Sequence, residues 1–126
     1  MTEKNQTYKC LKCGNIVEVL SAGDGTLTCC EKPMMLLREN TQEAAVEKHI
    51  PVVFRENNGV KVVVGEVEHP MTDDHWIEWV ELITAEKTHR HDFQPGDKPE
   101  CFFEISDEDF RVRAYCNLHG LWTNEK

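Results

Sequence analysis

Four cysteines in the first third of the chain constrain its fold more than any other feature. Cys10 and Cys13 are separated by two residues and followed by Gly14, whereas Cys29 and Cys30 are adjacent. A Cys-x2-Cys turn followed by glycine is typical of a metal-binding loop, because glycine lets the backbone N–H groups approach the sulfurs. A unit of roughly 30 residues buries too little apolar surface to fold without such a metal.

The spacing leaves open which metal these four thiols bind. A common zinc ribbon has two residues between the cysteines of each pair, so the adjacent Cys29 and Cys30 should strain a tetrahedral centre. Such a strained centre suits an iron site at least as well as structural zinc. A disulfide between Cys29 and Cys30 is a third alternative. We predict a first unit at residues 1–38, with a short strand around residues 16–20 and a hairpin near Gly23–Gly25.

Charge and hydropathy exclude several classes of partner. The 126 residues include 14 Lys and Arg against 23 Asp and Glu, a formal net charge of −9. We therefore expect no nucleic acid and no anionic membrane surface as partner. No apolar run approaches a membrane span, and the polar first residues lack the apolar core of a signal peptide. These features predict a cytoplasmic protein whose six cysteines are metal ligands or reduced thiols.

Short strand-like segments between turn signals fill the chain after residue 50. Asn57-Asn58-Gly59 is a strong hairpin signal. Residues 76–83 fit an amphipathic helix too, but their aromatic and β-branched content favours a strand. One helical turn with Thr41 as N-cap is expected within residues 41–49. We predict a mainly β protein in which residues 39–126 form an immunoglobulin-like antiparallel β-sandwich. The expected strands are 52–54, 60–67, 76–84, 101–105, 110–116 and a piece near 121–122.

A second group of metal-ligand residues is spread over the later part of the chain. Cys116 and His119 have a spacing that lets one tight turn direct both side chains at one ion. Strand parity places Cys116 on the apolar, inward face with Val112. Three further histidines lie upstream, at His49, His69 and His75. A fold that returns them to Cys116 would build a site of four imidazoles and one thiolate.

The two groups imply different chemistry. Iron(II) with four thiolates has a formal charge of −2 and no free position, so it can hold structure or pass single electrons. Iron(II) with four neutral imidazoles and one thiolate has a charge of +1, and five ligands leave one position open for an anion.

The complete ligand set, in this order, resembles the desulfoferrodoxins, the two-iron class of superoxide reductases. The resemblance runs from about residue 8 to residue 122. It implies two iron ions per chain, a desulforedoxin-like or rubredoxin-like first domain and a homodimer. The motifs are Cys10, Cys13, Cys29 and Cys30 for the tetrathiolate centre, and Glu47-Lys48-His49, His69-Pro70, His75-Trp76 and Cys116-Asn117-Leu118-His119-Gly120 for a square-pyramidal centre with Cys116 axial.

The resemblance further implies an oxidoreductase that reduces superoxide by one electron to hydrogen peroxide, with electrons from rubredoxin or a similar donor. By this likeness Lys48 would guide the anion and position a proton-donating water, and Glu47 would be the sixth ligand of the resting ferric iron. Two alternatives remain open: a non-catalytic one-electron carrier and a zinc-stapled structural module.

We expect the other chemically notable residues to be structural. His89 and His91 fit a solvated loop, and Cys101 fits a small apolar residue of a strand. We expect the three tryptophans in the core rather than in contact with the ligands: Trp76, Trp79 and Trp122. Trp76 could also line the metal site. Ala114 stands where the resemblance leads us to expect an acidic residue.

Overall fold

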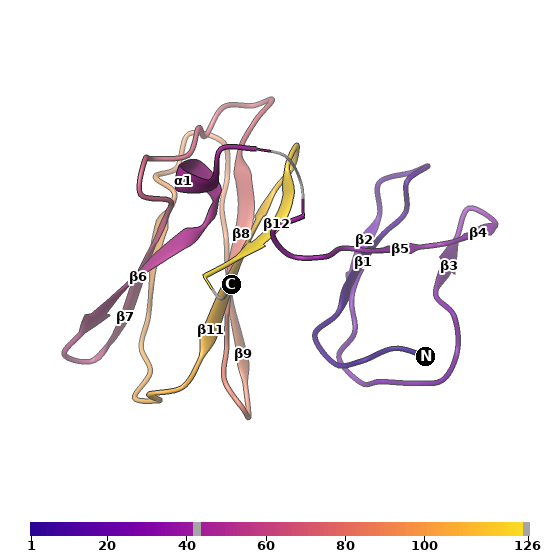
Figure 1. The fold of residues 1–126 in the computed structure, drawn as a ribbon, viewed down its shortest axis with the longest axis horizontal. Helices are drawn as coiled ribbons and strands as arrows, with labels where there is room; N and C mark the ends of the chain where they lie inside the picture. The colour runs from indigo at the N-terminus through magenta and orange to yellow at the C-terminus, as the bar shows by residue number, and fades with distance from the viewer. Residues whose placement is uncertain (42–43, 125–126) are drawn as a thin grey trace. The chain divides into compact units, whose positions relative to one another are not determined.

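The computed structural model describes residues 1–41 and 44–124 and divides the chain into two compact units, residues 1–38 and 39–126 (Figure 1). The first unit is built from very short antiparallel strands. Its sheets have the orders β2-β1-β5 and β3-β4. The strands are β1 (Thr7–Lys9), β2 (Ile16–Glu18), β3 (Thr28–Cys29), β4 (Lys32–Pro33) and β5 (Met35–Leu36).

The hairpin predicted near Gly23–Gly25 is wrong. β2 pairs with β1, and β3 pairs with β4. Gly23 instead accepts a hydrogen bond from the backbone N–H of Thr2 and donates its own N–H to the Thr2 hydroxyl. The glycine-rich stretch is therefore a loop tied to the N-terminal segment. Among the described residues of this unit, only Thr7, Cys10 and Val19 are buried, which agrees with a unit that needs a metal for stability.

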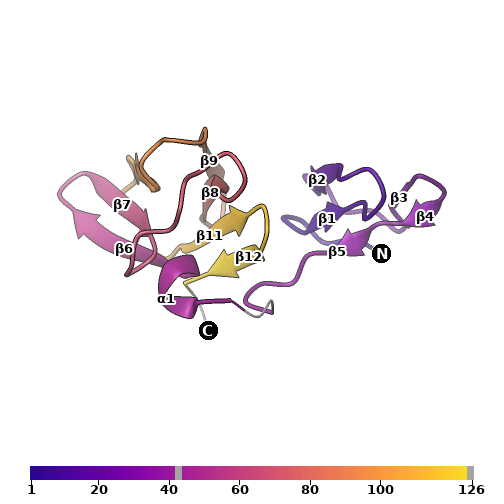
Figure 2. The same cartoon turned by 90° about the horizontal axis from the view of Figure 1, so that it is seen from above.

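The second unit is an antiparallel β-sandwich, as predicted. One sheet has the strand order β10-β7-β6 and the other β12-β11-β8-β9. Seen from above, the β6–β7 pair lies on one side of the unit and β8, β11 and β12 lie on the other (Figure 2). The strands are β6 (Pro51–Glu56), β7 (Gly59–Val64), β8 (Ile77–Ile83), β9 (Thr88–Asp92), β10 (Glu100–Phe103), β11 (Arg111–Cys116) and β12 (Gly120–Thr123).

Two local predictions for this unit are confirmed. β6 and β7 form a hairpin in which Glu56 faces Gly59 across a two-residue turn. Residues 77–83 form a strand rather than a helix. No helix among the described residues is long and apolar enough to cross a membrane.

The core lies between the two sheets and follows the two-residue period of the strands. β11 contributes Val112, Ala114 and Cys116, all fully buried, so the parity argument for Cys116 is confirmed. An acidic residue in place of Ala114 would have to enter this apolar layer. The facing sheet contributes Val60, Val62, Val64, Cys101 and Phe103.

His89 and His91 do not lie in a loop, which corrects our expectation. They belong to β9, at the edge of the four-stranded sheet, opposite Leu82 and Val80. The His91 ring lies 4.7 Å from that of Phe93. The Thr88–Asp92 segment lacks apolar alternation because an edge strand with exposed side chains needs none.

The single described helix, α1 (Val46–His49), is shorter than expected and begins after Ala45 rather than Thr41. Thr41 is therefore not its N-cap, and residues 42–43 lie outside the described chain. The helix ends where the Ile50 N–H donates to the Val46 carbonyl, just before β6 starts at Pro51. This brief turn fixes the direction of Lys48 and His49.

The outer face of the four-stranded sheet holds a buried ion pair. Arg113 Nη2 lies 2.7 Å from Glu81 Oε1, and both side chains are almost completely buried. Arg111 Nη1 lies 2.7 Å from Glu39 Oε1. Further along the same two strands, the rings of Trp79 and Tyr115 stack with centroids 4.5 Å apart.

Candidate metal centres

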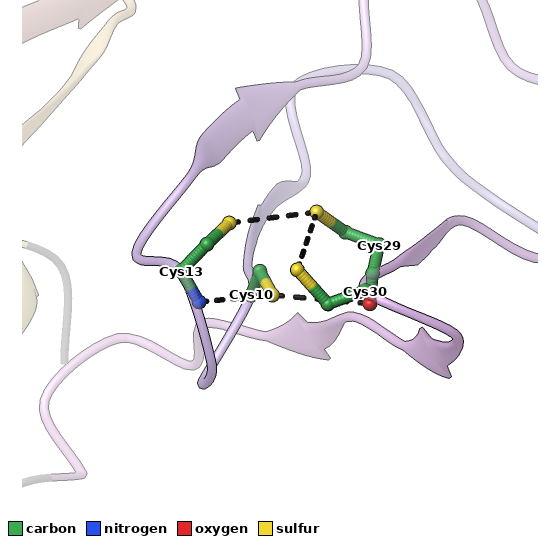
Figure 3. Close-up of side chains that lie close together, drawn as sticks. All are labelled: Cys10, Cys13, Cys29 and Cys30. Atoms are coloured by element: carbon green, nitrogen blue, oxygen red, sulfur yellow. Dashed lines mark hydrogen bonds between the residues drawn. The ribbon is translucent and has the colours of Figure 1, made fainter.

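The four cysteines of the first unit converge, as predicted. Their sulfurs all lie within 4.8 Å of one another (Figure 3). Cys29 Sγ lies 3.6 Å from Cys13 Sγ and 3.9 Å from Cys30 Sγ. Metal–sulfur bonds of about 2.3 Å in a tetrahedron place the sulfurs roughly 3.8 Å apart, so the cluster fits a tetrathiolate ion. A disulfide would need about 2.05 Å, and all four cysteines are free.

An unusual turn lets two adjacent cysteines contribute. Cys30 and Glu31, which connect β3 and β4, have φ values of +52° and +66°. Two-residue hairpin turns of type I′ need positive φ at both central residues, where non-glycine residues are disfavoured. The strain expected from adjacent ligands is therefore located in this backbone turn.

Electrostatics in the cluster favour a bound cation. The Cys13 N–H donates to Cys10 Sγ at 3.5 Å, and this contact lowers the pKa of Cys10 to about 6. The pKa of Cys30 rises to about 12, chiefly because its thiol hydrogen-bonds to the sulfur of Cys13. One thiolate forms readily, but the others need a positive ion among them to lose their protons.

In the second unit, four imidazoles form a ring. Following the order His49, His69, His75, His119 and back to His49, neighbouring ring centroids are 4.6, 4.7, 5.1 and 5.0 Å apart, and each pair is edge-on. His49 and His75 lie opposite each other, 6.3 Å apart and nearly parallel. Helix α1, the loops before β8 and the turn between β11 and β12 supply these residues.

The coordinating nitrogens point toward one another. His49 Nε2 lies 3.1 Å from His69 Nε2 and 3.2 Å from His119 Nδ1. Two metal–nitrogen bonds of about 2.1 Å at a right angle span roughly 3.0 Å. His49, His75, Cys116 and His119 offer ligand atoms that all lie within 4.8 Å of one another, and His69 joins them through His49.

Hydrogen bonds to carbonyls determine the protonation of two of these rings. His49 Nδ1 donates to the Ala45 carbonyl and His69 Nδ1 to the Pro70 carbonyl, each at 2.7 Å. In the neutral rings both Nε2 atoms then carry lone pairs, which repel each other at 3.1 Å unless a cation lies between them. Nε2 of His75 is buried and has no hydrogen-bond partner among residues 1–41 and 44–124. The five side chains therefore fit a metal ion.

Burial keeps these imidazoles in the form that binds metals. It lowers the pKa of His69 to about 4 and also lowers the pKa of His49 and of His75. Lower pKa values favour the neutral form of these three rings, whose lone pairs can bind a metal.

Cys116 lies on the core side of the imidazole ring. Its side chain is fully buried, and Sγ lies 3.9 Å from His119 Nδ1. Burial raises the pKa of the Cys116 thiol, and hydrogen bonds from the backbone N–H groups of Leu118 and His119 oppose that rise. A cation in the ring would complete the stabilisation of the thiolate.

Lys48 and Glu47, the other predicted site residues, differ in placement. Lys48 is half-buried, and its positive charge contributes, after burial and the neighbouring imidazoles, to lowering the pKa of His49 and His75. Glu47 is exposed and lines an open pocket with Glu66 and Asn124. It does not belong to the described cluster of ligand atoms.

Two residues near the ligands were not foreseen. Trp122 is buried, as expected, but its ring stacks on His49 with centroids 4.9 Å apart, which corrects its assignment away from the ligands. Its Nε1 donates to the His119 carbonyl at 2.9 Å. Asn117 bonds to the segment around His75. A polar residue between two ligands is the only sequence signal that could have identified Asn117.

Comparisons with known proteins agree with this architecture. The family description "Desulfoferrodoxin" matches residues 41–125, and "Desulfoferrodoxin, N-terminal domain" matches residues 2–37. The chain is 55% identical to a desulfoferrodoxin of Syntrophotalea carbinolica over 125 residues, covering 99% of both chains. It is 50% identical to a desulfoferrodoxin of Nitratidesulfovibrio vulgaris, again with 99% of both covered.

A solved structure, the superoxide reductase from Treponema pallidum, resembles this one with a TM-score of 0.73 and 33% identity. The match covers 93% of this chain and 97% of that protein. Both family descriptions and the full-length relatives thus agree with the two ligand clusters. The chain belongs to the desulfoferrodoxin family.

Proposed function

We propose that this protein is a superoxide reductase that converts superoxide, one electron and two protons into hydrogen peroxide without releasing dioxygen. The observation that carries the proposal is the convergence of His49, His69 and His119 nitrogens at 3.1–3.2 Å, with the buried Sγ of Cys116 3.9 Å from His119 Nδ1. The similarity to a superoxide reductase of known structure supports it.

The metal ligands we propose are Cys10, Cys13, Cys29 and Cys30 for one iron, and His49, His69, His75, Cys116 and His119 for the other. An iron ion in the second site would supply the electron at a position that five protein ligands leave open. The thiolate of Cys116 would donate electron density to such an ion, and imidazole ligands would add no charge.

We propose Lys48 as the guide for the anion, which its half-buried position beside the ligand His49 in the chain supports. The unit of residues 39–126 carries nine Lys and Arg against nineteen Asp and Glu, a net charge of −10, which repels superoxide. A charge pair 10 Å apart in water contributes only about 0.4 kcal/mol, so Lys48 acts close to the imidazoles. We also assign it the positioning of a proton-donating water. For Glu47 we propose a movement from its exposed position to the oxidised centre.

The four-cysteine centre has the placement of an electron-transfer site. Cys13 and Cys30 are exposed, so their sulfurs are accessible to a partner. We propose rubredoxin or a similar small carrier as the donor. We assign residues 1–38 to a desulforedoxin-like tetrathiolate domain and residues 39–126 to the immunoglobulin-like domain with the catalytic site.

We also propose a cytoplasmic homodimer. The free state of all six cysteines suits a reducing compartment. On the outer face of the β10-β7-β6 sheet, the exposed rings of Phe54 and Phe102 flank Lys61, which pairs with both of them across the neighbouring strands, and this gives apolar surface for self-association. Sedimentation velocity at micromolar concentration tests the dimer.

The activity is tested by mixing reduced, iron-loaded protein with superoxide and measuring peroxide and dioxygen. We expect one peroxide per superoxide, no dioxygen and oxidation of the histidine-ligated iron at nearly diffusion-limited speed. The zinc-loaded protein and Cys116→Ser serve as inactive controls. Slow oxidation without loss of superoxide would favour the one-electron carrier, and a colourless protein that contains only zinc would favour the structural module.

A further inference from the structure

The segment around His75 is attached to the Cys116–His119 turn by one side chain. The Oδ1 atom of Asn117 accepts a hydrogen bond from the Trp76 N–H at 2.9 Å, and its Nδ2 donates to the Asp74 carbonyl at 2.9 Å. The backbone N–H of Asn117 donates to the Trp76 carbonyl at 3.2 Å. These bonds reach the residues on both sides of His75.

These Asn117 hydrogen bonds, which we call the Asn117 clamp, lie where regular sheet pairing stops. β11 and β8 pair in register up to Tyr115 opposite Trp79, and the register then shifts so that Cys116 faces Ile77. Beyond Cys116 the ladder ends, and the side chain of Asn117 provides the next cross-strand hydrogen bonds. The ligand-bearing ends of the two segments therefore depend on Asn117 for their separation.

His75 needs such a support more than two of the other ligands. His49 and His69 each have a ring nitrogen bonded to a carbonyl, which orients the ring. Neither ring nitrogen of His75 has a hydrogen-bond partner among the described residues, so its direction follows from its backbone. The Thr72 hydroxyl accepts a hydrogen bond from the His75 N–H and so closes the turn before β8. Asn117 joins this turn to the segment that carries Cys116 and His119.

We propose that Asn117 is a positioning residue for the iron site: its amide holds the His75 segment at the distance from Cys116 and His119 that the ion requires. This inference rests on the proposed function, since it assumes that the five side chains bind iron. Residues that orient metal ligands typically contribute 10–100-fold to metal affinity.

The test compares Asn117→Ala and Asn117→Asp with Asn40→Ala in the full-length, iron-loaded protein. Asn40 is a matched control, because its amide also makes two hydrogen bonds to backbone, here to Thr123, which is not a proposed ligand and does not flank His75. The readouts are the visible spectrum of the histidine-ligated iron, the rate of iron release to a chelator, and the thermal midpoint. The tetrathiolate spectrum is an internal reference.

We expect Asn117→Ala to shift the spectrum of the histidine-ligated iron and to speed its release about 10-fold or more, with the tetrathiolate spectrum unchanged. Asn117→Asp, which keeps the acceptor for Trp76 but not the donor to Asp74, should fall between Asn117→Ala and the parent. Spectra and release rates equal to those of Asn40→Ala would overturn the inference. So would loss of the cooperative melt in both variants, because Asn117 would then support the fold rather than the site. A parent protein that binds no iron at these histidines would instead refute the proposed function.

Discussion

The indole of Trp122 stacks on the imidazole of His49 with 29° between the planes, while its Nε1 donates to the carbonyl of His119. One buried side chain thus contacts two proposed ligands that lie 70 residues apart in the chain. Stability and the iron site should therefore respond together to changes at this position.

Trp122→Phe keeps a stacking ring but removes the bond to His119, so we expect a loss of about 1 kcal/mol in the free energy of unfolding and a changed spectrum of the histidine-ligated iron. Trp122→Ala should cost about 3–5 kcal/mol, because it leaves a cavity. Urea denaturation measures both. Trp79→Phe is the control, since the Trp79 indole N–H is buried and finds no hydrogen-bond partner in the described part of the chain. An equal effect of the two phenylalanine variants would contradict the role of the bond.

Gly65 should tolerate no side chain, because of the helix that carries Lys48. A Cβ on Gly65 would lie 2.6 Å from the Glu47 carbonyl oxygen and 2.8 Å from the carbonyl carbon of Lys48. We expect Gly65→Ala to cost about 1–3 kcal/mol and to loosen iron binding at His49, because backbone atoms must shift. Denaturation and chelator release measure this effect.

Gly25→Ala is the control for Gly65→Ala, since a Cβ added at Gly25 would meet no atom of the described residues within 4 Å. Equal free energies of unfolding and equal rates of iron release in the two variants would show that the close approach of Gly65 to α1 does not exclude a side chain.

The buried pair of Arg113 and Glu81 should be far more sensitive than an exposed pair. Arg113→Met leaves the Glu81 carboxylate buried without its main partner, and we expect a loss of about 3–5 kcal/mol. Adding Glu81→Leu should restore much of this loss. Lys61→Met, which breaks an exposed pair with Glu100, should cost less than about 1 kcal/mol. Similar values for the two single variants, measured by urea denaturation, would rule out this difference.

Cys101 should resist alkylation in the folded protein. Burial raises the pKa of its thiol to about 12, so the thiolate is scarce at pH 8. In metal-free protein the exposed Cys13 should react with iodoacetamide first, and Cys101 only after unfolding in urea; mass spectrometry of the peptides separates them. Because the folded pKa lies above the unfolded one, Cys101 contributes stability below about pH 9 that is lost as the pH rises toward 12. Rapid native labelling of Cys101 would be inconsistent with this burial.

Much of this fold and of both sites follows from local sequence rules. Two-residue periodicity placed Cys116 in the core, and Asn57-Asn58-Gly59 located the first hairpin of the sandwich. The convergence of the histidines with Cys116 came from the family resemblance, because no spacing rule relates ligands that lie so far apart in the chain.

The failures share a physical cause, which is dependence on tertiary neighbours. β9 has no apolar alternation, and its place at the edge of the sheet is decided by pairing with β8. The burial of Arg113 depends on Glu81, which lies opposite it only once the strands are in register. Likewise, Asn117 becomes a clamp only when Asp74 is brought beside it.

Iron content measured together with the visible spectrum tests the central claim most directly, in the parent protein, Cys116→Ser and Cys13→Ser. We predict two iron ions per chain in the parent. Cys116→Ser should lose the spectrum of the histidine-ligated iron and keep that of the tetrathiolate centre, and Cys13→Ser should show the reverse. A parent with a single iron, or a Cys116→Ser protein whose two spectra are unchanged, would contradict the account.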